Sequence, residues 1–238
     1  MNTRINRIVA LSLVGMASAS MALAQSAPGN EPASEKASTE KPAQLSKAPE
    51  TTSATAPSTS QPDEAAMMQQ MIELAKLNEN HKLLENLAGT WNYTVKMWMD
   101  PSGKPSESTG TAVRKMVMDG RYLHGDYSGK FKMPGPDGKM KETTFKGNSL
   151  DGYDNVKKKF ISSWVDNMGT GIMISEGTYD PVTKTFTYTS EYEAVPGMKS
   201  KVREVITVAD KDHHAMEYYE DRGQGEVKSM EINYTRKK

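Results

Sequence analysis

The amino-acid sequence predicts an all-β protein: a ten-stranded antiparallel up-and-down β-barrel with short N-terminal helices. From residue 89 onward, apolar and polar side chains alternate in short runs, which is typical of strands with one buried face. Turn residues such as Asp119-Gly120 and Pro196-Gly197 separate the runs, and no long helical segment interrupts them. Ten short strands in a flat sheet would leave exposed edges, whereas closure into a barrel removes them.

Each expected strand is bounded by turn chemistry on both sides. The expected strands span 90–99, 108–118, 121–132, 141–150, 158–166, 171–179, 184–193, 199–209, 213–220 and 226–236. One of the separators between them is Asp151-Gly152-Tyr153-Asp154. Because successive side chains of a strand alternate between faces, parity predicts which of them point inward. In the first strand these are Trp91, Tyr93, Val95 and Met97, together with Met99.

Four segments precede or form the barrel. Residues 1–24 resemble a cleaved signal peptide, with Arg4 and Arg7, an apolar stretch and an Ala-x-Ala site. Residues 25–62 contain six of the 12 prolines and predict a disordered Pro/Ser/Thr/Ala-rich spacer. Residues 63–88 form an amphipathic helical lead-in, and residues 89–238 form the barrel. We therefore expect a periplasmic or secreted protein.

Composition excludes several classes of function. The 238 residues include 30 basic and 30 acidic side chains and no cysteine. Balanced charge argues against nucleic-acid binding, and the absence of cysteine excludes disulfides and thiolate metal sites. The mean hydropathy of −0.67 argues against a multi-span membrane protein, and no membrane span is expected in the mature chain. No metal or cofactor is predicted.

All 17 aromatic residues lie at or after Trp91, so the barrel interior is expected to be aromatic. A barrel of this size either fills with side chains or holds one small ligand. The candidates to line a ligand cavity are Tyr93, Met97, Trp164, Tyr188, Tyr192 and Tyr234. The expected partner is accordingly a small hydrophobic or amphipathic molecule.

Gly89-Thr90-Trp91 lies where a short helix meets the first strand, and it resembles the entry motif of lipocalin- and calycin-like barrels. The resemblance implies that Trp91 closes one barrel end and that an arginine from a late strand covers it. Arg236 has the position and parity for this structural role.

A longer resemblance covers residues 78–238. Asn80-His81-Lys82-Leu83-Leu84, Trp164-Val165-Asp166-Asn167 and Ser175-Glu176-Gly177-Thr178 are similar to segments of the bacterial family catalogued as domain of unknown function 1579. The family has no established activity, so the resemblance implies a calycin-like barrel and no reaction.

Histidines and methionines raise three further hypotheses. His81 precedes the barrel and is either a contact at its mouth or a helix-capping residue. His213 and His214 point to opposite faces of a strand, which disfavours joint metal binding, and a haem ligand is a weaker hypothesis still. The paired methionines are more typical of side chains that fill an irregular hydrophobic core than of a Cu(I) site. A Cu(I) site would require four thioethers to lie within one coordination sphere. The four are those of Met97, Met99, Met116 and Met118.

Three functions remain open, of which the binding of a small ligand is favoured. The second is a protein-interaction module of the cell envelope that uses the spacer and the Met-rich helix. The third is a small-molecule enzyme, which needs an inward carboxyl with a shifted pKa. The candidates for that carboxyl are Asp166, Glu176 and Glu204, and a turn-capping role is favoured for Asp166.

Overall fold

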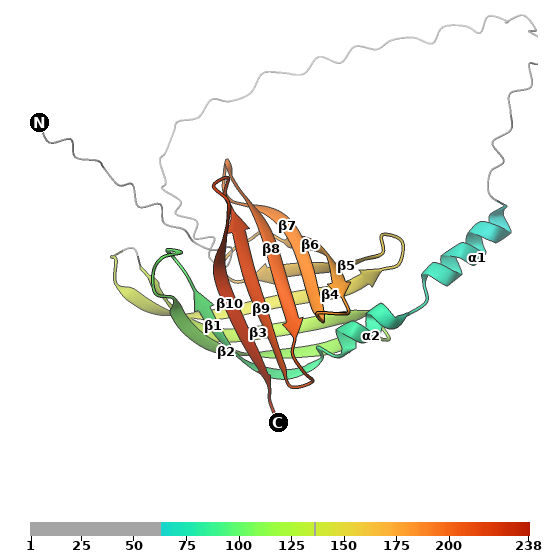
Figure 1. Cartoon of the computed structure of the whole chain (residues 1–238), viewed down its shortest axis with the longest axis horizontal. Helices are drawn as coiled ribbons and strands as arrows, with labels where there is room; N and C mark the ends of the chain where they lie inside the picture. The colour runs from blue at the N-terminus through green and yellow to red at the C-terminus, as the bar shows by residue number, and fades with distance from the viewer. Residues whose placement is uncertain (1–62, 136) are drawn as a thin grey trace, which may run out of the picture. The chain divides into compact units, whose positions relative to one another are not determined.

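The structure is a computed structural model that describes residues 63–135 and 137–238. The predicted signal peptide and spacer lie outside the described residues. Ten strands in the described part of the chain close into one antiparallel barrel, each strand pairing with its sequence neighbours and β1 pairing with β10 (Figure 1). The predicted fold class is confirmed, and a calycin-like barrel is compatible with it.

The strands agree closely with the ten expected runs. Their bounds are β1 Gly89–Met97, β2 Ser106–Val117, β3 Tyr122–Pro134, β4 Met140–Asp154, β5 Lys159–Asp166, β6 Met173–Asp180, β7 Thr185–Val195, β8 Met198–Val208, β9 His213–Asp221 and β10 Glu226–Arg236.

One expected turn is wrong. Asp151 and Gly152 belong to β4, which continues to Asp154 and pairs with β5 along that length. The ring of Tyr122 lies so close to Gly152 that a Cβ there would collide with it. Gly152 therefore makes room for a neighbouring ring inside a strand, and the turn follows at Asn155.

The two helices differ in their burial. Helix α1, Glu64–Leu74, has no buried residue. Most of it belongs to a unit separate from the barrel. Helix α2, Glu79–Glu85, is part of the barrel unit and begins with a capping box at Asn78. Among the described residues, neither helix is long and apolar enough to cross a membrane.

Helix α2 covers one end of the barrel. Leu84 and the following Leu87 are buried there, 1% and 5% exposed, against strand residues such as Phe160 and Phe186. Burying a side chain of this size stabilises a fold by about 1.5–3 kcal/mol. Both leucines belong to the amphipathic lead-in predicted over residues 63–88, and their apolar side chains close this end of the barrel.

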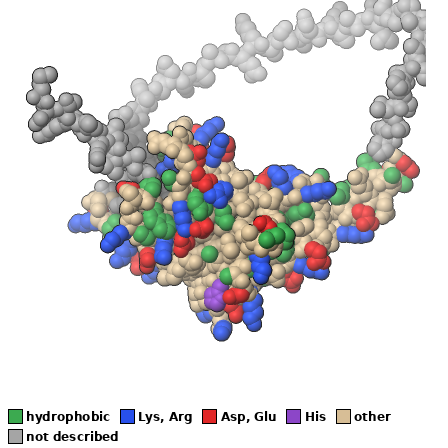
Figure 2. Space-filling model, viewed as in Figure 1, with side chains coloured by type: hydrophobic (Ala, Val, Ile, Leu, Met, Phe, Trp, Pro, Cys, Tyr) green, Lys and Arg blue, Asp and Glu red, His purple; other side chains and the backbone are tan. Residues whose placement is uncertain are grey.

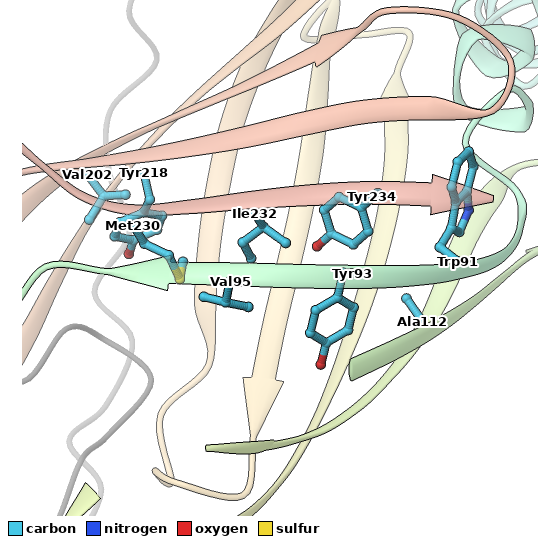
Figure 3. Close-up of a cluster of buried hydrophobic side chains, with 9 residues drawn as sticks. All are labelled: Trp91, Tyr93, Val95, Ala112, Val202, Tyr218, Met230, Ile232 and Tyr234. Carbon is cyan, nitrogen blue, oxygen red and sulfur yellow. The ribbon is translucent and has the colours of Figure 1, made fainter. Parts of the chain in front are cut away.

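A second cluster of buried side chains lines the seam between β1 and β10 (Figure 3). Trp91 lies at the end near α2, and Met230 and Val202 lie toward the other end. The register pairs Tyr93 with Tyr234 and Val95 with Ile232, so both strands present the same parity to the interior. Alternation in the two strands thus produces one continuous inner surface.

Candidate functional site

The barrel encloses a cavity of about 130 Å³. Leu84 of α2 and Leu87, which follows the helix, line its closed end, and the exposed Lys130 is among its lining residues at the other end. Most of the lining is aliphatic or aromatic. A mostly apolar cavity with a few fixed polar groups is the usual form of a small-molecule site.

Five of the six predicted ligand contacts line this cavity, namely Tyr93, Met97, Trp164, Tyr188 and Tyr234. Tyr192 is not among the lining residues. It packs against the seam cluster, and its hydroxyl donates to Glu220 Oε1 at 3.2 Å. Whether the five bind a ligand stays a prediction.

Glycines leave room for the large rings on the inner surface. A Cβ at Gly110 would collide with the ring of Tyr93, whose hydroxyl donates to the Ser128 carbonyl at 3.0 Å. A Cβ at Gly147 would lie 2.6 Å from the indole of Trp164. Such glycines in the middle of strands indicate close approach of a side chain, and here they fix the position of cavity-lining rings.

Among the described residues, two basic side chains line the cavity, Arg114 on β2 and Lys130. Of these, only Arg114 is buried. Its Nε donates to the Tyr127 hydroxyl at 3.0 Å, and its Nη1 lies 3.0 Å from His214 Nε2. Its guanidinium also stacks 4.7 Å above the Tyr234 ring. A buried arginine needs such partners, because an unpaired buried charge is costly.

His214 acts as the acceptor for Arg114. Burial, and then the charges of Arg114 and Arg236, lower the pKa of His214 to about 2, so the imidazole is neutral. Its ring stacks on Tyr234 with centroids 4.4 Å apart. Since Nε2 accepts a hydrogen bond, the proton is on Nδ1, which has no partner among the described residues. This geometry assigns His214 to holding Arg114 in place.

Two carboxyl groups also line the cavity. Asp151 on β4 accepts hydrogen bonds from Ser149, at 3.0 Å, and from Ser162, but burial still raises its pKa. Glu204 on β8 makes no hydrogen bond with the described residues. Burial, and then the charge of Asp151, raise the pKa of Glu204 to about 7. The barrel therefore holds one carboxyl that titrates near neutrality.

The other candidate carboxyls lie elsewhere. Asp166 accepts from Trp164 Nε1 at 2.9 Å and from the Met168 amide at 2.8 Å, which is the favoured turn-capping role. Glu176 lies on the outer face, where Lys157 and Lys159 pair with it and lower its pKa to about 2. Figure 2 shows acidic and basic side chains interspersed in this way over the visible face.

At the closed end, Arg236 lies over Trp91, with Cζ 4.1 Å from the centre of the indole. Its Nη1 donates to the Ala88 carbonyl at 2.7 Å, and Trp91 Nε1 donates to the Leu87 carbonyl at 3.0 Å. Gly89 has a φ of +133°, and a Cβ there would collide with the guanidinium. Gly89, Trp91 and Arg236 together connect β1 and β10 to the segment that follows α2.

His81 is a capping residue in this structure. Its Nδ1 accepts the Asn78 amide at 3.1 Å, and its ring meets the edge of Tyr153. Burial lowers its pKa. His81 is not among the cavity-lining residues, and it lies on α2 at the closed end of the barrel.

The four methionines of the Cu(I) hypothesis do not converge. Met97 pairs with Ser106, whereas Met116 lies ten residues further along β2, about 33 Å away at the usual rise per residue. Met99 and Met118 are 42% and 70% exposed. Among the described residues, no group of three or more histidine, aspartate and glutamate side chains is arranged to hold a metal.

Comparison with known families matches residues 76–236 to the family described as "Protein of unknown function (DUF1579)". The chain belongs to this family. Its resemblance to DUF1579 in the sequence is thereby confirmed, and the match covers α2 and all ten strands of the barrel.

Two solved structures are similar to this DUF1579 protein. One is described as a de novo designed fluorescence-activating β-barrel, with 10% identity and a TM-score of 0.33 over 65% of this chain and 96% of that chain. The other is EF1p2_mFAP2b bound to DFHBI, with 12% identity and a TM-score of 0.32 over 66% and 98% of the two chains. A search of the curated proteins finds no match.

Sequence reasoning missed two residues of the DUF1579 cavity. Arg114 has the inward parity of Ala112 and Met116, which is a readable signal, but a charged residue was not expected inside. At Asp151 the Asp-Gly pair predicts a turn, because Asp-Gly is typical of turns. Its inward orientation follows only once β4 is seen to continue past Gly152.

Proposed function

We propose that the barrel binds a small amphipathic molecule in its interior cavity, after export of the protein to the cell envelope. The apolar part of the molecule would lie against Trp164, Phe145 and Met97. Its polar group would face Arg114 and the two carboxyls that line the cavity, Asp151 and Glu204. The observation that carries this proposal is one cavity with a mostly apolar wall and a few charged groups, of which Arg114 is buried.

The empty volume of the cavity and a carboxyl left unpaired in the described part of the chain support ligand binding rather than an interior that only stabilises the fold. Well-packed protein interiors leave few voids larger than a water molecule, and a void costs stability. Polar groups inside such a void need partners, and Glu204 has none among the described residues. A bound molecule would fill the space and supply the missing contact.

The test is the binding of N-phenyl-1-naphthylamine, a probe whose fluorescence rises in apolar surroundings, to the full chain. Ile206 lines the cavity, so Ile206→Trp fills part of it and should weaken binding by about tenfold or more, equivalent to 1.4 kcal/mol. Ile174 is 54% exposed on β6, so Ile174→Trp is the matched control and should bind as the wild type does. Equal binding by all three proteins would contradict an interior site.

A small-molecule enzyme is the second candidate, favoured by the pKa of about 7 at Glu204. A carboxyl that titrates near neutrality can donate or accept a proton during a reaction. Extracts of small molecules incubated with the wild type would then differ in composition from those incubated with Glu204→Gln. Identical mass spectra for the two would count against catalysis.

A further inference from the structure

We propose that the cavity recognises a positively charged organic amine, with Glu204 as the counter-ion of its ammonium group. The inference rests on the proposed binding function and names the chemical class of the ligand. Its starting point is a carboxyl that lines the cavity without a hydrogen-bond partner among the described residues.

Glu204 lies between two tyrosines on adjacent strands. The register pairs it with Tyr188 on β7 and with Tyr218 on β9, and directly paired residues of antiparallel strands share a face. Both tyrosines are 4% exposed and line the cavity. The Tyr218 hydroxyl is directed to Met173 Sδ at 3.8 Å rather than to Glu204. A carboxylate flanked by aromatic rings is an environment that suits an organic cation.

The balance of charge in the cavity also favours a cation. Arg114 is already bonded to Tyr127 and His214, and its charge acts on the nearby Asp151. When both carboxyls are ionised, Glu204 is the charge left without compensation. Its raised pKa is caused by burial and by Asp151, with no basic group acting in the opposite direction. A bound ammonium would supply that missing charge.

Arg114 is the feature that would favour the opposite ligand, a carboxylate. An anion placed beside it would also approach Asp151, on which the charge of Arg114 already acts, and like charges in an apolar site repel strongly. The Tyr234 ring covers one side of its guanidinium, 4.7 Å away. The net arrangement therefore favours an amine, and a carboxylate ligand becomes a defined outcome of the test.

The experiment uses three molecules with the same eight-carbon chain: octylamine, 1-octanol and octanoate. Each displaces N-phenyl-1-naphthylamine from the full chain at pH 8, where octylamine is protonated and Glu204 is mostly ionised. We expect octylamine to displace the probe at about tenfold lower concentration than 1-octanol, a difference of 1.4 kcal/mol. Octanoate is expected to be the weakest of the three.

Glu204→Gln removes the charge and keeps the shape, so it should abolish the preference for octylamine while leaving 1-octanol unchanged. Glu191→Gln, on the exposed face of β7, is the matched control and should keep the preference. Glu204→Asp keeps the carboxylate but withdraws it by one methylene, and the preference should fall in part. If Glu204→Gln does not fold, Glu204→Asp decides, and an unchanged preference in it overturns the inference.

Three results would overturn the inference while leaving the proposed function intact. The first is equal displacement by octylamine and 1-octanol, and the second is the tightest binding by octanoate, which would assign the head group to Arg114. The third is a preference for octylamine that survives in Glu204→Gln. If the probe itself does not bind, or Ile206→Trp does not weaken it, the proposed function fails instead.

Discussion

Glu204→Gln should make the stability of the protein less dependent on pH. The pKa of Glu204 is about 7 in the folded barrel, against 4.5 for the free side chain. Below pH 4.5 the carboxyl is protonated in both the folded and the unfolded state and contributes nothing. Between pH 4.5 and 7 the unfolded chain releases this proton while the folded chain keeps it, so the free energy of unfolding falls as pH rises. Above pH 7 the loss is complete.

The size of this loss follows from the two pKa values. At 1.36 kcal/mol per pKa unit, the difference corresponds to about 3 kcal/mol. For a barrel of this length, that is a decrease in Tm of about 6–12 °C between pH 4.5 and pH 8. Part of the shift is the repulsion between Glu204 and Asp151, which Glu204→Gln also removes.

Urea denaturation at pH 4.5, 6 and 8, followed by far-ultraviolet circular dichroism, measures the effect. The curves of unfolding free energy against pH for wild type and Glu204→Gln should separate by about 3 kcal/mol across this range. Glu191→Gln should run parallel to the wild type. Parallel curves for wild type and Glu204→Gln would refute the burial of an uncompensated carboxyl.

Three further outcomes are expected. Arg236→Met removes hydrogen bonds to carbonyls and the stacking on Trp91, so it should lower the free energy of unfolding by about 2 kcal/mol in urea denaturation. Gly110→Ala should lower it by about 1–3 kcal/mol by driving a methyl group into Tyr93, whereas Gly171→Ala, which meets open space, should leave it nearly unchanged. The His214 imidazole should stay neutral down to pH 4 in an NMR titration, and a chemical-shift transition above that pH would contradict its burial beside Arg114.

Alternation of side chains was sufficient to predict the barrel, because period two and turn residues are local signals. It also predicted which rings of β1 and β10 share the inner face, since parity is a property of each strand alone. Alternation did not predict the position of Asp151. The local Asp-Gly signal there favours a turn, but pairing with the neighbouring strands keeps this part of β4 extended. Only the pairing of β4 with both β3 and β5 shows that this residue is inside.

The grouping of charges in the cavity could not be predicted from parity. Arg114, Asp151 and Glu204 lie on β2, β4 and β8, and their proximity depends on the register and the closure of the whole barrel. The sequence shows that Glu204 is inward, but not that Tyr188 and Tyr218 flank it. Such cross-strand neighbours are set by pairings that a one-dimensional pattern does not contain.

Because Trp91 on β1 pairs with Arg236 on β10, the barrel can close only after the last strand has been synthesised. The first strand leaves the ribosome without the partner that seals it, and that partner is synthesised last. At about 5–20 residues per second, β1 waits many seconds for β10. A chain that stops before Glu226 would keep two unpaired edges, on β1 and β9, and these edges are templates for aggregation. Late nonsense mutations in this protein are therefore expected to yield insoluble chains rather than shortened barrels.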